Sequence, residues 1–155
     1  MNVRVFLMEH LSKVVRGWRI RKLHAQGYKN ISKHCVIERG VLLDKIKPSG
    51  IYIGEGCLIA AGTTILCHEH IYRDKNNPKI PFTTDTYIGK RCFVGVRALI
   101  LPGVKIGDDC VIGAGCTVNK DIPSGCMAVG VPARIVKTGL KMNDRAELII
   151  DKKYE

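Results

Sequence analysis

An aliphatic side chain returns at every sixth position through most of this chain. The repeat runs in three blocks, at Ile31, Ile37, Leu43, then Ile53, Ile59, Ile65, then Ile88, Val94, Ile100, Ile106, Ile112 and Val118. At about 3.3 Å per extended residue, six residues make one short strand and one tight corner. Three such strands close a triangular coil of about 18 residues. The twelve repeats therefore predict an all-β parallel solenoid of four coils.

A helical bundle does not explain the same pattern. Six is not a multiple of the 3.6 residues of a helical turn, so the aliphatic positions would spread around a helix. The position after each aliphatic is usually small, and several of these residues are glycine, which destabilises helix interiors. They include Gly54, Gly89, Gly107 and Gly113.

Five of the seven cysteines follow the same six-residue register. They stand four residues after a repeat aliphatic, at Cys35, Cys57, Cys92, Cys110 and Cys116. A free cysteine packs as a small hydrophobic residue, so we predict that these five are core residues. No Cys-x2–4-Cys pair of the kind that binds zinc is present. Cys67 and Cys126 fall outside the register, and Cys67 is a candidate for a position near a functional site.

The positive charge of the chain is concentrated near its N-terminus. The 155 residues carry a formal net charge of +11, and residues 1–35 contribute eight basic side chains against one acidic one. Three Phe and one Trp offer few stacking platforms, so we expect no nucleic-acid partner. No apolar run approaches the roughly 20 residues of a membrane-spanning helix. We therefore expect a cytoplasmic protein with reduced thiols.

Residues 3–24 are predicted to form an amphipathic helix. Apolar residues gather on one side, and basic residues recur every three positions on another. The apolar set is Leu7, Leu11, Val14, Val15 and Trp18, and the basic set is Lys13, Arg16, Arg19 and Lys22. Such a helix either caps the open end of the solenoid or lies on an anionic membrane surface.

The repeat breaks twice. After Leu43 it resumes four residues late, across the turn-forming sequence of residues 47–50. After Ile65 it resumes 17 residues late, which predicts an extruded loop at about residues 66–87. A long loop on a rigid scaffold often carries function. This loop begins Cys67-His68-Glu69-His70, and histidine is the side chain best suited to accept a hydroxyl proton near neutral pH.

The second half of the repeat resembles the hexapeptide-repeat acyltransferases. The resemblance is carried by LILPGVKIGDDCVIGAGCTVNKDIP and by GVPARIVK, and it covers about residues 31–137. It implies a left-handed parallel β-helix, a homotrimer with active sites between subunits, and acetyl-coenzyme A as the acyl donor, with no metal. We divide the chain into an N-terminal basic helical segment (1–30), the β-helix (31–137) and a C-terminal tail or short helix (138–155).

The His-Glu-His sequence is similar to that of the sugar and polysaccharide O-acetyltransferase branch. The resemblance implies that His70 is the general base and that His68 assists it or binds substrate. Glu69 or Asp85 would orient the imidazole, and both assignments remain open. Cys67, Asp85 and Phe93 are candidate acceptor-site residues, with Phe93 standing where relatives often carry Trp. The implied reaction is acetyl transfer to a sugar hydroxyl, in bacterial surface or capsular polysaccharide biosynthesis.

The same resemblance places the donor along the solenoid. Small residues would let the pantetheine arm approach the backbone, and basic residues would meet the coenzyme phosphates. The first group is Gly95, Ala98, Gly113 and Ala114, and the second is Lys120, Arg134 and Lys137.

Several other functions fit parts of the pattern. Serine or xenobiotic O-acetyl transfer and amino-sugar N-acetyl transfer would use the same histidines. A non-catalytic structural solenoid would need neither the loop nor the basic residues near the end of the chain. Zinc catalysis is disfavoured, because the His-x4-His pair of the hexapeptide carbonic anhydrases is missing.

Overall fold

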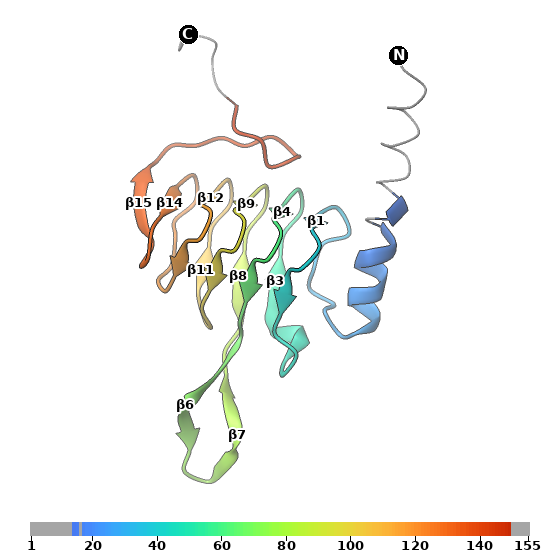
Figure 1. Cartoon of the computed structure of the whole chain (residues 1–155), viewed down its shortest axis with the longest axis vertical. Helices are drawn as coiled ribbons and strands as arrows, with labels where there is room; N and C mark the ends of the chain where they lie inside the picture. Colours follow the sequence, from blue (N-terminus) through green and yellow to red (C-terminus); the bar gives the residue numbers. More distant parts are fainter. Residues whose placement is uncertain (1–13, 16, 150–155) are drawn as a thin grey trace.

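The computed structural model describes residues 14–15 and 17–149, and most of them wind into a coil of short parallel strands (Figure 1). The coil has three faces, each built from strands that stack in register from one turn to the next. The first face contains β3 (Ile51–Ile53), β8 (Thr86–Ile88) and β11 (Lys105–Ile106). The second contains β1 (Val36–Ile37), β4 (Leu58–Ile59), β9 (Phe93–Val94) and β12 (Val111–Ile112). The third contains β2 (Leu42–Leu43), β5 (Thr64–Ile65), β10 (Leu99–Ile100) and β13 (Thr117–Val118).

The strand register confirms the parallel solenoid and its four coils. On the third face, Leu43 pairs with Ile65, Ile65 with Ile100, and Ile100 with Val118. All twelve repeat aliphatics are buried. They form one continuous ladder of side chains through the middle of the coil.

The prediction that the five in-register cysteines are core residues is also confirmed. All five are buried free thiols. Several thiols donate to a carbonyl of the next coil, as Cys57 Sγ does to Gly89 O (2.9 Å) and Cys92 Sγ to Gly107 O (3.0 Å). Thr63 stands in the same register and donates to Gly95 O (3.1 Å). The position therefore favours a small side chain that can also donate a hydrogen bond.

Where a glycine follows the aliphatic, as at Gly54 and Gly89, the spacing between coils requires it. A Cβ atom on Gly89 would lie 2.6 Å from the carbonyl carbon of Gly107 and 2.4 Å from Asp108 Oδ1. A Cβ on Gly54 would lie 2.5 Å from Gly89 O. A larger residue at either position would push neighbouring coils apart.

The two breaks in the repeat form different structures. The shorter break holds a single 3-10 turn, η1 (Pro48–Gly50). The longer break is an antiparallel hairpin of β6 (His68–Asp74) and β7 (Asn77–Thr83), which projects away from the coil in Figure 1. The sequence predicts an extruded segment here but not that its two arms would pair.

The coil continues beyond the last predicted repeat into a partial fifth turn. Ile122 bridges to Ile106, and β14 (Met127–Val129) pairs with β12. Cys126, which the sequence analysis placed outside the register, follows Ile122 by four residues and is buried like the others. The strand β15 (Arg134–Lys137) then pairs with β14 in the antiparallel sense and ends the sheet.

The first and last described segments of the chain contact the coil. Residues 14–15 and 17–25 are helical and lie beside the first coil, while residues 3–13 and 16 of the predicted helix fall outside the described residues. Residues 138–149 run back along the corners of the coil as an extended segment with one bridge, between Met142 and Leu148. Within the described residues, no helix is long and apolar enough to cross a bilayer.

The close approach at Gly89 leads to a stability prediction. Gly89→Ala should lower the free energy of unfolding by about 1–3 kcal/mol, the usual cost of overpacking. Gly17→Ala is the control, because among the described residues no atom outside the neighbouring helix backbone lies within 4 Å of its added Cβ. Urea denaturation followed by circular dichroism measures both variants. An unchanged midpoint for Gly89→Ala would contradict the stacking argument.

Candidate functional site

The two histidines lie where the hairpin leaves the coil. His68 is the first residue of β6 and pairs with Thr83 of β7, so the hairpin base fixes its backbone. Beneath it, one coil earlier, Asp44 follows the inward Leu43. The parallel register of β2 with β5 places residue 44 under residues 66–68. The coil therefore brings together an acid and a histidine that are 24 residues apart in sequence.

Asp44 is a fully buried carboxylate with several hydrogen-bond donors around it. Its Oδ1 accepts from the N–H of Ile46 (2.9 Å), and its Oδ2 accepts from the N–H groups of Cys67 (2.8 Å) and His68 (2.9 Å). The Nδ1 atom of His68 also lies in hydrogen-bond contact with Oδ2. Burial alone would raise the pKa of Asp44, but these hydrogen bonds outweigh it and hold the pKa below its ordinary value.

The contacts continue outward through a second imidazole. His68 Nε2 lies 3.2 Å from His70 Nε2, and the two rings meet edge to face at 86°. An Arg73 guanidinium nitrogen lies 2.9 Å from His70 Nδ1. Because guanidinium can only donate, His70 Nδ1 must accept, and a neutral His70 then carries its proton on Nε2. That proton points to His68 Nε2, and the Nδ1 proton of His68 points to Asp44.

Glu69 and Asp85, the two acids predicted as orienting groups, differ in their surroundings. Asp85 accepts from Lys47 Nζ (2.7 Å) and from the Tyr87 hydroxyl (3.3 Å), and the Lys47 hydrogen bond holds the pKa of Asp85 below its ordinary value. Glu69 pairs with Phe82 across the hairpin, and among the described residues its Oε1 has no hydrogen-bond partner. Among the residues that the structure describes, Asp44 is the acid with a hydrogen-bond contact to an imidazole.

Cys67 contributes to the site through its backbone N–H, which donates to Asp44 Oδ2. Its side chain is fully buried, and its thiol donates to Lys47 O (3.1 Å). Burial, followed by the negative charge of Asp44, raises the pKa of the Cys67 thiol to about 12. A thiol with this pKa is not ionised near neutral pH, which argues against a cysteine nucleophile here.

The candidate donor residues occupy the later coils. The N–H groups of Gly95, Ala98 and Gly113 all donate to carbonyls within the coil. A Cβ on Gly95 would lie 2.6 Å from Ala114 N, so coil stacking by itself demands a glycine there. Phe93 is half-buried on β9.

The three candidate phosphate-binding side chains are all exposed. Arg134 and Lys137 are the end residues of β15, and Lys120 follows β13. Guanidinium and ammonium groups at the end of the coil suit the phosphates of a coenzyme. Within one chain, no contact among the described residues links these three basic side chains to His68 or His70.

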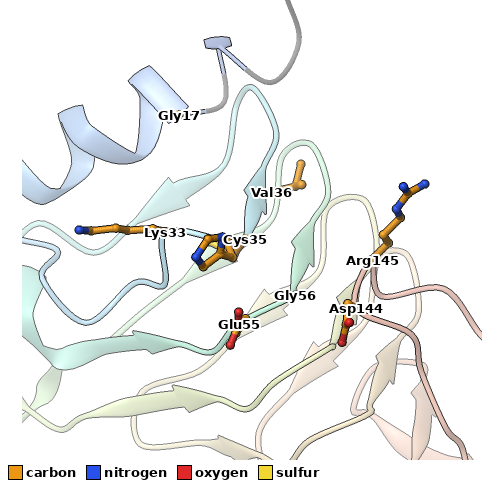
Figure 2. Close-up of a pocket in the computed structure, with 9 residues that line it drawn as sticks. Gly17, Lys33, Cys35, Val36, Glu55, Gly56, Asp144 and Arg145 are labelled. Carbon is orange, nitrogen blue, oxygen red and sulfur yellow. The ribbon is translucent and has the colours of Figure 1, made fainter. Parts of the chain in front are cut away.

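One surface hollow adjoins the candidate site, and a second lies away from it. One lies beside the His68 imidazole and is lined by Leu42, Ile46 and Leu66 together with Asp44. The other lies near the helix, the first two coils and the C-terminal segment (Figure 2). Its charged side chains are of both signs, Lys33 and Arg145 against Glu55 and Asp144. The second hollow contains none of the candidate site residues.

The chain is similar to known acetyltransferases. A family described as the hexapeptide repeat of succinyl-transferase matches residues 46–67 and 86–120. YvoF of Bacillus subtilis (strain 168) is 38% identical over 68% of this chain and 58% of its own length. Galactoside O-acetyltransferase of Escherichia coli (strain K12) is 35% identical over 68% of this chain and 51% of its own length. The chain thus spans little more than half the length of these curated relatives.

Solved structures show the same fold. A hexapeptide-repeat-containing acetyltransferase of Vibrio cholerae O1 biovar eltor, complexed with acetyl coenzyme A, matches with a TM-score of 0.59 and 28% identity. That match covers 68% of this chain and 57% of the other. A maltose O-acetyltransferase from Clostridium difficile 630 matches with a TM-score of 0.53 over 81% of this chain and 87% of its own, and at 23% identity it shows the fold alone. These matches imply that the coil is a left-handed β-helix.

Sequence reasoning missed Asp44, although a signal was present. Most repeat aliphatics are followed by a small residue, whereas acids follow Ile37 and Leu43. The loop that carries the histidines begins one coil later, directly above Asp44. Of these two acids, Asp44 is the one that lies one coil below the start of the insertion, and that position was the available signal.

Asp44 generates a prediction about stability and pH. In Asp44→Asn an amide NH2 must replace one carboxylate oxygen and would face an N–H donor, so the free energy of unfolding at pH 7 should fall by about 1–3 kcal/mol. Because folding lowers the pKa of Asp44, its contribution is complete above the unfolded value of about 3.9 and is lost as the pH falls through the folded value. Urea titrations at several pH values should show the two proteins converging below about pH 4.

Asp85→Asn is the control for this measurement. The Lys47–Asp85 pair is partly exposed, and pairs of this kind contribute less than about 1 kcal/mol. Equal destabilisation by the two substitutions would mean that the buried hydrogen bonds of Asp44 contribute no more to stability than the partly exposed Lys47–Asp85 pair.

Proposed function

We propose that this chain, part of which matches the hexapeptide repeat of succinyl-transferase, is an acetyl-coenzyme A-dependent O-acetyltransferase that acts on a sugar hydroxyl. The observation that carries this proposal is the line of contacts from buried Asp44 through His68 to His70. The galactoside O-acetyltransferase among the named relatives supports a sugar acceptor. Acetyl coenzyme A bound to the Vibrio cholerae relative supports the donor.

The two imidazoles can divide the work of proton transfer. His70, the outer and more exposed ring, takes the proton of the acceptor hydroxyl on Nδ1 once Arg73 moves aside. It passes its Nε2 proton to His68 Nε2 across the 3.2 Å contact. The positive charge then resides on His68, whose Nδ1–H faces the Asp44 carboxylate. Placing an anion beside the developing imidazolium lowers the cost of taking up the proton.

The acyl transfer itself needs no covalent enzyme intermediate. The deprotonated acceptor oxygen attacks the thioester carbonyl, and a tetrahedral oxyanion forms. Its collapse breaks the C–S bond, and the leaving coenzyme thiolate takes the proton back through the histidine pair. The high pKa of Cys67 supports this direct route over a cysteine acyl-enzyme.

The larger biological setting is part of the same proposal. We place the enzyme in the cytoplasm, in bacterial surface or capsular polysaccharide biosynthesis, as a homotrimer with active sites between subunits. The hairpin supports an assembly, because it carries large apolar side chains that are exposed in the single chain, namely Ile71, Tyr72, Ile80 and Phe82. The separation of the basic residues on β15 from the histidine pair also fits a donor site completed by a neighbouring subunit.

A kinetic experiment tests the function. Release of coenzyme A thiol from acetyl-coenzyme A is measured with sugars, amino sugars, serine and antibiotics as acceptors. A sugar hydroxyl should be the preferred acceptor, and His70→Ala should lower kcat/KM by about 10²–10⁴-fold, the usual contribution of a general base. Asp44→Asn should lower kcat more than it raises KM and shift the acidic limb of the pH profile.

His34→Ala is the control, because His34 is exposed, belongs to the first coil and is well separated in sequence from the hairpin. Turnover unaffected by His70→Ala would sink the proton-transfer assignment. Turnover with serine, an antibiotic or an amino sugar, but with no sugar hydroxyl, would replace the acceptor class. No turnover with any acceptor would favour a structural solenoid.

The basic strand β15 has its own prediction. Arg134→Ser combined with Lys137→Ser should raise the KM for acetyl-coenzyme A about tenfold with little change in kcat, because charge-assisted phosphate contacts act equally in ground and transition states. Lys141→Ser is the control, since Lys141 is exposed but lies outside the strand. An unchanged KM would show that these side chains do not meet the coenzyme.

A further inference from the structure

The N-terminal helix presents two opposite faces. One packs on the coil, where Ile20 is 3% exposed and Leu23 contacts the core. His24 Nε2, on the same side, lies 2.7 Å from Ile31 O. These contacts explain how the helix covers the open end of the first coil, and they leave its other face outward.

The outward face carries large apolar side chains. Val14 is 66% exposed, Val15 is 51% exposed and Trp18 is 65% exposed. At about 100° per residue these three positions fall on the side of the helix opposite Ile20. The capping role therefore accounts for the inner face alone, and the exposed Trp and Val side chains need a different explanation.

Basic side chains surround this apolar patch. Arg21 and Lys22 are exposed, and Arg19 is partly exposed beside them. Lys22 Nζ lies 5.6 Å from the centre of the Trp18 ring, and the hollow next to the ring is also bordered by Arg39. The sequence contains no Asp or Glu between residues 14 and 37, so no acid in the described part of the helix offsets this charge.

We propose that this outer face binds the surface of an anionic lipid bilayer, with the helix lying in the plane of the membrane. An apolar centre with basic flanks matches a bilayer interface, where aliphatic and Trp side chains enter the boundary with the acyl chains while Lys and Arg meet lipid phosphates. A second copy of the same face would instead bring like charges together. The proposal concerns the helix and holds whether or not the proposed acetyl transfer is correct.

Trp18 allows a direct test, because it is the only Trp in the chain. The full-length protein is mixed with vesicles of phosphatidylcholine, with or without phosphatidylglycerol. With the anionic vesicles, the protein should co-sediment and the Trp emission should shift to shorter wavelength. With phosphatidylcholine alone, or at high salt, the affinity should be at least about tenfold weaker, since exposed charges are screened.

Two charge variants separate the helix from the general positive charge of the protein. Arg21→Ser with Lys22→Ser should weaken binding to the anionic vesicles by about tenfold or more. Lys105→Ser with Lys141→Ser removes the same charge from exposed positions outside the helix and should leave binding unchanged. Circular dichroism at each step checks that the coil is folded.

Three outcomes would overturn the proposal. The first is no sedimentation of the wild-type protein with anionic vesicles. The second is an equal loss of binding in both charge variants, which would mean non-specific attraction. The third is an emission shift that depends on protein concentration and not on lipid, which would mean that the face meets a second copy of the chain.

Discussion

The stacking of one coil on the next is the constraint on which this structure depends. Each coil must place an aliphatic side chain inward at the same position as its neighbours, and the backbone after it must pass close to the next turn. Gly89 shows how little room remains, because a single added carbon would overlap the following coil. The thiols and the Thr63 hydroxyl use the same closeness to donate hydrogen bonds between coils. Rigid stacking of this kind can hold a catalytic group in place without a large domain around it.

The candidate site uses that rigidity across two coils. Asp44 belongs to the first coil, and the histidines belong to the hairpin that leaves the second. The carboxylate is anchored from below by its own turn and from above by the backbone of Cys67 and His68. These hydrogen bonds therefore hold the backbone in place where the β6–β7 hairpin begins. The apolar side chains farther out on the hairpin are exposed in the single chain.

The N-terminal helix illustrates how one segment can satisfy two demands. Its inner face covers an end of the coil that would otherwise leave aliphatic side chains in water. Its outer face concentrates basic and apolar side chains that the coil does not use. The +11 net charge of the chain thus divides between the N-terminal region and scattered residues such as those on β15.

The sequence by itself determined the coil, because a six-residue period of inward aliphatics is a local property that every turn repeats. It therefore predicted the four coils, the buried cysteines and the position of the extruded segment. Only the tertiary structure decided which acid meets the histidine, since the partner of His68 depends on the register between coils and on the extra residues at each break. For the same reason it decided that Asp85 pairs with Lys47, that the insertion is a hairpin, and that Ile122 begins a fifth turn.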